Sequence, residues 1–255
     1  MNWTVDYGDG ERPVELPHAW RQDVPVAFEG PVCYRTSISV TAADSWLLFD
    51  AVSYAASVFV DDELLVQHEG LWDAFSVDLS AYQGRTVDVR VEVVKNGGRR
   101  FPVCDVLSGF LPYVFHTFGG IWGDVRLVQG DTDPCSPEPK CEPRVSLEGG
   151  RIFLEGEPFR PKGVLSWGWY PDLGHPNPSE EEMIKEIETV KRLGFNLIKF
   201  CLWVPQNRFL ELMQKQGIKA WIELPLWDPN LSPKNEDLVL QELRRVVQQR
   251  RHHSN

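Results

Sequence analysis

The stretch LGFNLIKFCLWVPQNRFLELMQKQGIKAWIELPLW, residues 193–227, decides the fold of the second half of the chain. It contains two apolar runs, Asn196–Leu202 and Ile218–Leu224, which flank a helical segment over Gln206–Gln216 that ends at Gly217. Nearly continuous apolar strands that alternate with helices are typical of a parallel sheet covered by helices. The sequence therefore predicts α/β structure for this region.

The same alternation extends to both sides of this stretch. Short strands are expected at Ile152–Leu154 and Lys162–Leu165. A helix is expected to begin after Ser179, because Ser179 and Glu182 have the spacing of a capping box. Gly194 stands where a left-handed residue would end that helix. A further helix is expected over Glu236–Arg250, so we predict about three strand–helix units in all.

Residues 1–130 have the pattern of antiparallel β-structure. Apolar and polar side chains alternate along Val32–Val40 and again along Val87–Val93, which is the period of a half-buried strand. Further strands are expected at Trp46–Asp50, Tyr54–Val60, Leu64–Gln67 and Asp124–Val128. Several short strands with no helical segment between them predict a β-sandwich.

A proline-rich segment separates the two halves. Residues 131–144, DTDPCSPEPKCEPR, hold four prolines and few side chains that could enter a core. This composition is typical of a linker. We therefore predict a β domain over residues 1–130, a linker over 131–146, and an α/β domain over 147–255.

Composition excludes several classes of function. The chain has 255 residues and a formal net charge of −11, so binding to nucleic acid or to an anionic membrane is not expected. No basic and apolar leader opens the sequence, which favours a cytoplasmic location. The five cysteines include no C-x-x-C pair. Cys135 and Cys141 could form a disulfide in an oxidising compartment, but the missing leader favours free thiols.

Several phrases resemble glycoside hydrolase family 2, the group of β-galactosidases, β-glucuronidases and β-mannosidases. In the first half these are LPHAW (residues 16–20), EGPVCYR (29–35), the stretch from Phe49 to Gly70, and FGGIWGDVRL (118–127). In the second half they are KGVLSWGWYPD (162–172), LGFNLIKFCLWVP (193–205) and GIKAWIELPLW (217–227). The resemblance implies a jelly-roll, galactose-binding-like β-sandwich followed by an incomplete (β/α)8 TIM barrel. The family's immunoglobulin-like domain has no counterpart between the two.

The resemblance also implies a reaction, the hydrolysis of β-linked glycosides with retention by two glutamates. In the family, the acid/base glutamate ends barrel strand 4 and the nucleophile ends strand 7. The closing residues RRHHSN (250–255) resemble the segment before strand 4. Neither role can therefore be given to a residue of this chain, and we assign no catalytic residue, no metal site and no cofactor. The chain by itself is expected to be inactive, and the alternative is a non-catalytic carbohydrate-binding module or an assembly protein.

Candidate substrate-binding side chains follow the three expected barrel strands, because active sites of such barrels lie at the carboxyl ends of the strands. Tryptophan faces suit the apolar face of a sugar, and charged groups suit its hydroxyls. The candidates are Trp167, Trp169, Asp172, Lys199, Trp203, Glu223 and Trp227. Glu223 stands out because it ends an apolar strand and precedes Pro225.

Each candidate also has a structural interpretation. Trp167 and Trp221 could fill the core, Asp172 and Lys199 could form an ion pair, and Glu223 could bond a neighbouring loop. Asp172 and Glu223 could instead form a carboxylate pair of their own.

Two further expectations concern surfaces. The aromatic segment Arg99–Gly120 either reaches the barrel mouth, with Arg100, Asp105 and His116 as polar candidates, or packs between the domains. An incomplete barrel exposes sheet edges and an apolar interior, which predicts self-association.

Overall fold

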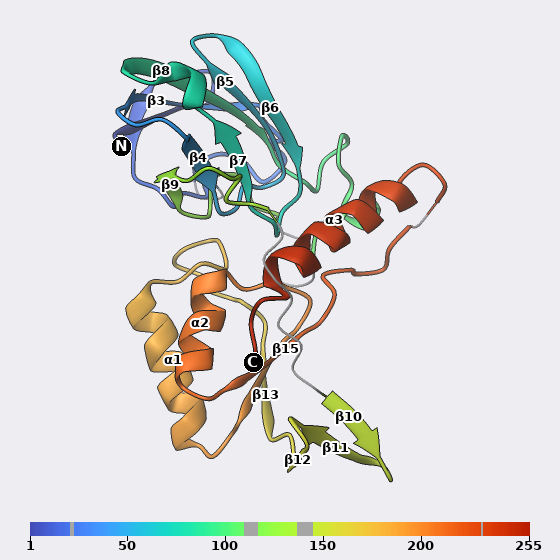
Figure 1. Ribbon diagram of the computed structural model, residues 1–255. Coiled ribbons are helices and arrows are strands. Elements are labelled where there is room, and N and C mark those ends of the chain that lie inside the picture. The colour runs from blue at the N-terminus through green and yellow to red at the C-terminus, as the bar shows by residue number, and fades with distance from the viewer. Residues whose placement is uncertain (21–22, 110–116, 137–144, 231) are drawn as a thin grey trace.

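The computed structural model describes residues 1–20, 23–109, 117–136, 145–230 and 232–255 (Figure 1). Strands dominate, and three α-helices lie in the second half of the described chain. No helix among the described residues combines the length and the apolar character that a membrane crossing requires.

The first half contains two antiparallel sheets. The larger has the order β2-β1-β3-β8-β5-β6 and the smaller the order β7-β4-β9. The larger sheet is made of β1 (Trp3–Asp6), β2 (Arg12–Val14), β3 (Val32–Val40), β5 (Ala55–Val60), β6 (Glu63–Glu69) and β8 (Arg85–Val94). The smaller is made of β4 (Ser45–Phe49), β7 (Phe75–Asp78) and β9 (Val125–Gln129).

The two sheets pack face to face because each has one apolar face. Along β3 every second side chain is buried, as the alternation in the sequence predicts. Val58 and Val91 of the larger sheet share one buried cluster with Leu47 and Phe75 of the smaller sheet. The strands predicted for this half are confirmed, and the short strands β1, β2 and β7 are additional.

Two motifs of the first half meet at this core. The amide of Trp20 donates to the carbonyl of Gly119 at 2.9 Å, and the amide of His18 donates to the carbonyl of Ile121 at 2.8 Å. A β-carbon on Gly119 would stand 1.8 Å from the buried ring of Trp20. The LPHAW and FGGIWG phrases are therefore two sides of one contact, and only glycine fits at residue 119.

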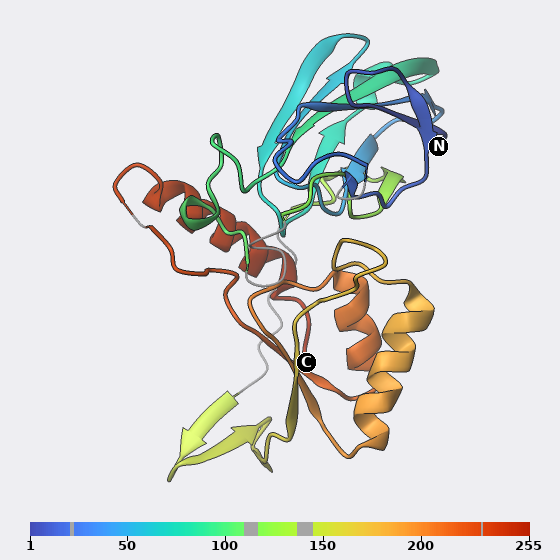
Figure 2. The same cartoon turned by 180° about the vertical axis from the view of Figure 1, so that it is seen from behind.

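The second half begins with a small antiparallel sheet of β10 (Val145–Glu148), β11 (Arg151–Leu154) and β12 (Glu157–Phe159). Three parallel strands follow in the order β13 (Gly163–Ser166), β14 (Leu197–Phe200) and β15 (Lys219–Ile222). Helices α1 (Glu180–Arg192) and α2 (Asn207–Lys215) lie on one face of these strands (Figure 2). The expected capping box of Ser179 and Glu182 opens α1.

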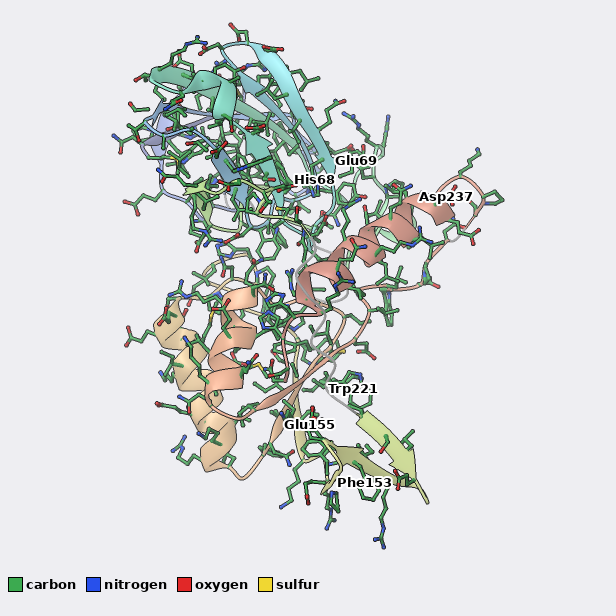
Figure 3. All side chains as sticks on the ribbon, viewed as in Figure 1. His68, Glu69, Phe153, Glu155, Trp221 and Asp237 are labelled. Carbon is green, nitrogen blue, oxygen red and sulfur yellow. The ribbon has the colours of Figure 1, made fainter. Side chains whose placement is uncertain are left out.

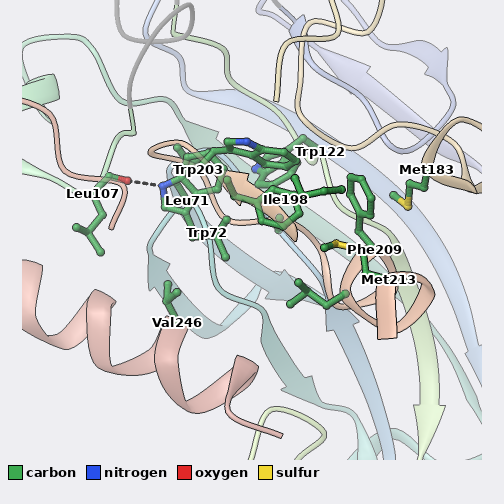
Figure 4. Close-up of a cluster of buried hydrophobic side chains, with 14 of the residues drawn as sticks. Leu71, Trp72, Leu107, Trp122, Met183, Ile198, Trp203, Phe209, Met213 and Val246 are labelled. Atoms are coloured by element: carbon green, nitrogen blue, oxygen red, sulfur yellow. Dashed lines mark hydrogen bonds between the residues drawn. The ribbon is translucent and has the colours of Figure 1, made fainter. Parts of the chain in front are cut away.

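The third helix, α3 (Glu236–Arg250), takes a different course. It runs along the junction between the two halves rather than beside α1 and α2 (Figure 1). Val239 and Val246 of α3 join a buried cluster that includes Trp72 and Trp122 from the first half and Trp203 from the second. Figure 4 shows this cluster. The division at residues 131–146 stays a prediction, and the packing of side chains runs across it.

Charged side chains form part of the buried stripe of α3. Its buried residues are Val239, Glu242, Val246 and Arg250, which share one helix face. Glu242 is 1% exposed, and its carboxyl group accepts hydrogen bonds from the Tyr54 hydroxyl and from the Leu107 amide, the latter at 3.1 Å. Every partner of Glu242 named here belongs to the first half of the chain, so this residue ties α3 to the β-sheets.

Further polar contacts continue this attachment. The Arg250 guanidinium donates to the carbonyl of Trp72 at 3.0 Å, and Gln249 exchanges two 2.8 Å hydrogen bonds with the backbone of Ala74. Arg245 forms an ion pair with the buried Asp73. Because buried polar groups are costly when unpaired, these contacts fix the position of α3 closely.

Glu242 should make the stability of the protein depend on pH. Burial raises the pKa of its carboxyl group from 4.5 to about 8. The folded state therefore holds a proton that the unfolded state releases, and stability falls as the pH rises through about 8. We expect the free energy of unfolding to drop as the pH rises from about 4.5 to about 8, on the order of a few kcal/mol at most, and we expect Glu242→Gln to show less of this drop.

Urea unfolding of both proteins across this range measures the effect. The comparison uses the difference between wild type and variant, because groups other than Glu242 contribute equally to both. A difference that stays constant from low to high pH would show that Glu242 does not titrate as its burial implies.

Candidate functional site

The carboxyl ends of β13, β14 and β15 form one edge. The register aligns Ser166 with Phe200 and Phe200 with Ile222, so the residues that follow each strand start at the same level. Trp167, Cys201 and Glu223 are those residues. The parallel arrangement therefore brings together three segments that the sequence separates by more than twenty residues each.

Lys199 and Glu223 form the polar centre of this edge. Nζ of Lys199 lies 2.9 Å from Oε1 of Glu223, and the same ammonium group stands 5.5 Å from the centre of the Trp221 ring. The hydrogen bond from Lys199, followed by one from the Cys201 thiol, lowers the pKa of Glu223. Glu223 is therefore an anion at neutral pH. The ion pair of Lys199 is with Glu223, and not with Asp172 as one structural interpretation of the sequence has it.

Exposed tryptophans also follow two of these strand ends. Trp167 and Trp169 after β13 are each 40% exposed, and Trp227 after β15 is 42% exposed. Asp172 is also at the surface, in the loop between β13 and α1. We call Lys199, Glu223, Trp167, Trp169, Trp221 and Trp227 the strand-end group.

Trp203 differs from this group in being buried beneath it. Its side chain is 1% exposed, and its indole Nε1 donates to the carbonyl of Ser166 at 3.0 Å. Its ring packs edge-to-face on Phe200, with ring centres 5.0 Å apart. Leu202 immediately before it has φ 58°, a left-handed conformation that turns the chain at the end of β14. The turn sends Trp203 into the core, where its ring is covered by the chain's own side chains.

Trp221 is the residue whose place the sequence predicts least well. It is 56% exposed and points away from the helices, on the face of the sheet toward β10–β12 (Figure 3). Strand periodicity contains the signal, because Ala220 and Ile222 pack against the core on the helix side and Trp221 between them must face the other way.

Side chains outside the predicted set hold the loop between β13 and α1. The Tyr170 hydroxyl donates to Glu186 of α1 at 2.8 Å, and Asn177 donates to the carbonyl of Trp122 at 3.1 Å. Burial raises the pKa of Glu186 and lowers the pKa of His175 to about 4. This loop carries Trp167, Trp169 and Asp172, so the contacts of Tyr170 and Asn177 help to position them.

The aromatic segment of the first half does reach the loop after β15. The amide of Gly109 donates to the carbonyl of Pro225 at 2.8 Å, and Asn230 donates to Asp105 at 3.1 Å. Phe101 and Leu107 are buried in the cluster at the junction, so the segment also packs between the halves. The Arg100 guanidinium lies over the Phe101 ring. His116, like Cys141 of the possible disulfide, lies outside the described residues.

Among the described residues, no three histidine, cysteine or acidic side chains come together as a metal site would require. The charged pair and the aromatic rings of the strand-end group suit a polar ligand with apolar faces.

Comparison with known proteins gives sequence relatives of low identity. No protein-family model matches the chain. A β-glucuronidase of Bacteroides fragilis is 28% identical over 163 residues, which cover 57% of this chain and 22% of that enzyme. A β-galactosidase of Photobacterium profundum is 27% identical over 92 residues, 36% of this chain and 9% of that enzyme.

Solved structures match the fold along nearly the whole chain. A family 2 β-galacturonidase of Eisenbergiella tayi bound to galacturonate has a TM-score of 0.75 at 17% identity, with 99% of this chain and 62% of that chain covered. A β-glucuronidase of Ruminococcus gnavus in complex with D-glucuronic acid has a TM-score of 0.78 at 12% identity, covering 99% and 64%. The chain resembles glycoside hydrolase family 2. The resemblance predicted from the sequence is thus confirmed, and the relatives are β-glycosidases.

The chain spans only part of the length of these family 2 proteins. It covers about a fifth of the B. fragilis enzyme and just over three fifths of the two solved chains.

The link between Glu223 and Cys201 can be tested by titration. Burial, and next the hydrogen bond with Glu223, raise the pKa of the Cys201 thiol from 9.0 to about 11. Glu223→Gln removes the negative charge, so we expect the pKa of Cys201 to fall while burial keeps it above its ordinary value. NMR titration of protein labelled at the cysteine β-carbon measures this shift. Glu188→Gln, a change at an exposed residue of α1, serves as the control and should leave the pKa of Cys201 unchanged.

Proposed function

We propose that this chain is the N-terminal portion of a family-2-like retaining β-glycosidase, which hydrolyses O-glycosidic bonds in carbohydrates. The observation that carries the proposal is the strand-end group, in which the Lys199–Glu223 ion pair and exposed tryptophans lie at the carboxyl ends of neighbouring parallel strands. The resemblance of the chain to β-glucuronidases and β-galactosidases supports it.

The proposed architecture follows the family. Residues 1–130 would be its jelly-roll domain, 131–146 a linker, and 147–255 the first part of the (β/α)8 barrel. The two packed antiparallel sheets support the first assignment, and the parallel strands β13, β14 and β15 with α1 and α2 on one face support the last.

The strand-end group would bind sugar in this architecture. The flat, exposed rings of Trp167 and Trp227 offer surfaces for the C–H face of a sugar ring. Glu223 can accept hydrogen bonds from hydroxyl groups, and Lys199 can donate to ring or hydroxyl oxygens. These roles are binding and orientation.

Hydrolysis would need two catalytic carboxyl groups, and the family resemblance assigns neither to a residue of this chain. A retaining glycosidase uses an acid/base carboxyl group and a nucleophile ~5–5.5 Å apart. The resemblance places both after the segment that matches this chain, at the ends of barrel strands 4 and 7. We therefore propose that the chain binds β-linked carbohydrate without cleaving it, and that Glu223 has no catalytic role.

Calorimetry with β-linked disaccharides, together with assays on chromogenic β-glycosides, tests this proposal. We expect millimolar or tighter binding and no release of the chromophore. Trp227→Ala should weaken the binding about tenfold, because a stacked aromatic ring contributes roughly 1–2 kcal/mol. Leu147→Ala, a change at an exposed apolar residue of β10, should have no effect.

The other outcomes are also informative. Turnover by the wild type that Glu223→Gln abolishes would contradict the assigned roles and make Glu223 catalytic. Tight binding without turnover, retained when further barrel sequence is added, would favour a carbohydrate-binding module. No binding to any β-linked sugar would overturn the proposed site.

We further propose that the chain self-associates through the face of the parallel sheet opposite α1 and α2. Parallel sheets normally have both faces covered. On this face the side chains of Leu165 and Trp221 are exposed. Trp221, together with Ile152 and Phe159, lines an apolar groove of about 420 Å³ between the parallel strands and the small sheet.

Light scattering over a range of protein concentrations measures this association. We expect species larger than a monomer, and we expect Trp221→Lys to shift the distribution toward monomer because a charge on this face opposes its burial. Val26→Lys, at an exposed apolar residue of the first half, is the matched control and should leave the distribution unchanged. A wild-type monomer at all concentrations would contradict the proposal.

A further inference from the structure

A polar cleft lies between the first half and the amino end of α2, away from the strand-end group. Its volume is about 260 Å³. Asp50, Ala74, Asp124 and Arg126 line it from the first half. From the second half it is lined by Asn177, Gln206, Asn207, Arg208, Glu211 and Arg250. We call this space the junction cleft, and it shares no lining residue with the strand-end group.

Gln206 lines this cleft and contains an unused hydrogen-bond donor. The residue is 8% exposed, and its Nε2 has no hydrogen-bond partner among the described residues. Gln206 is also the N-cap of α2, and its side chain caps no amide of that helix. A buried amide nitrogen without an acceptor is costly, so a ligand oxygen that reached Gln206 from the cleft would relieve this cost.

Arg250 supplies a second buried donor group. It too is 8% exposed, and two of its nitrogens donate to the carbonyls of Trp72 and Pro205. Its Nη1 has only a 3.5 Å contact with Gln249, at the limit of a hydrogen bond. The guanidinium therefore retains donor capacity, and Arg250 is one of the residues that line the cleft.

Acceptors line the cleft as well. Asp50 is held by two oxygen contacts with Arg126, at 2.7 and 2.9 Å, and Arg208 is paired with Glu180 outside the cleft. Asp124 and Glu211 form no ion pair with any other described residue. Their carboxylates can accept hydrogen bonds from a ligand.

The charges of the lining exclude a simple ion as the best ligand. Three guanidinium groups face three carboxylates, so the formal charges cancel. An anion would meet the carboxylates of Asp124 and Glu211, and a cation would meet the buried guanidinium of Arg250. An apolar ligand has only Ala74 to contact. Hydroxyl groups fit this lining, because each can both donate to a carboxylate and accept from an amide or guanidinium.

We propose that the junction cleft binds a neutral, polyhydroxylated molecule of the size of one monosaccharide. Its volume lies just below the ~300–1,000 Å³ of pockets for drug-sized ligands, which limits the ligand to about one sugar ring. The site is separate from the strand-end group and depends on different residues. A ligand there contacts both halves of the chain, so its binding stabilises their junction.

NMR of the full chain reports on the two sites separately. The side-chain amide signal of Gln206, assigned by its loss in Gln206→Met, reports on the junction cleft, and the indole N–H signal of Trp227 reports on the strand-end group. The probes are D-galactose, D-glucose and D-mannose, with inorganic phosphate and glycine as ionic alternatives. We expect at least one neutral sugar to shift the Gln206 signal saturably at millimolar concentration.

Variants then show whether the sugar binds at the residues of the junction cleft. Glu211→Gln changes an exposed residue of α2 and should raise the concentration needed for half-saturation of the Gln206 shift at least threefold, because the amide is a poorer acceptor than the carboxylate. Glu188→Gln on α1 is the matched control and should leave the concentration unchanged. Trp227→Ala should also leave it unchanged.

Each remaining result overturns the inference. A Gln206 signal that moves with phosphate or glycine but with no neutral sugar identifies an ion site instead. A Gln206 signal that no probe moves, or that moves equally in Glu211→Gln, removes the cleft as a sugar site. If the Trp227 indole responds to sugar while Gln206 does not, the junction cleft fails and the proposed function of the strand-end group stands.

Discussion

The arrangement of the molecule depends on the buried carboxyl group of Glu242. It accepts hydrogen bonds from Tyr54 and Leu107, and so it joins the middle of α3 to the β-structure of the first half. Removing either hydrogen bond would leave a buried oxygen of Glu242 without a donor. The free energy of folding lost in this way is larger than an ordinary hydrogen bond contributes. With α3 fixed in this way, Arg250 at its end reaches Trp72 and lines the junction cleft. The segment after β15 is held as well, through the contact of Pro225 with Gly109.

The sequence predicted those elements whose signals are local. Nine residues of strict alternation in β3 leave little ambiguity, and the capping box fixes the start of α1 to the residue. The strands β1, β2 and β7 have only four, three and four residues, too few for a period of two to stand out. They are strands because neighbouring strands pair with them, and this is information that no single segment contains.

Placement of elements relative to one another was harder to predict. Periodicity indicates that α3 has a buried stripe, but Glu242 and Arg250 in that stripe resemble residues of a solvated face. Only the donors and acceptors of the first half make their burial possible. The exposure of the tryptophan side chains was equally hard to predict. Trp203 follows the left-handed Leu202 and enters the core, whereas Trp221 obeys the alternation of β15 and is exposed. The row of strand ends was predictable, and the exposure of each ring on it was not.

The packing of Trp72 against Trp122 gives the junction an optical signature. Their ring centres are 5.7 Å apart at an interplanar angle of 77°, and both rings are buried beside Val246 of α3. Two indoles held rigidly at such an angle in an asymmetric environment produce near-ultraviolet circular dichroism, which disappears when fixed side-chain packing is lost. The far-ultraviolet signal of the sheets does not depend on this contact. Because Val246 of α3 belongs to the same buried cluster, this contact contributes to the near-ultraviolet band a signal from the junction, beside the signals of the other buried tryptophans.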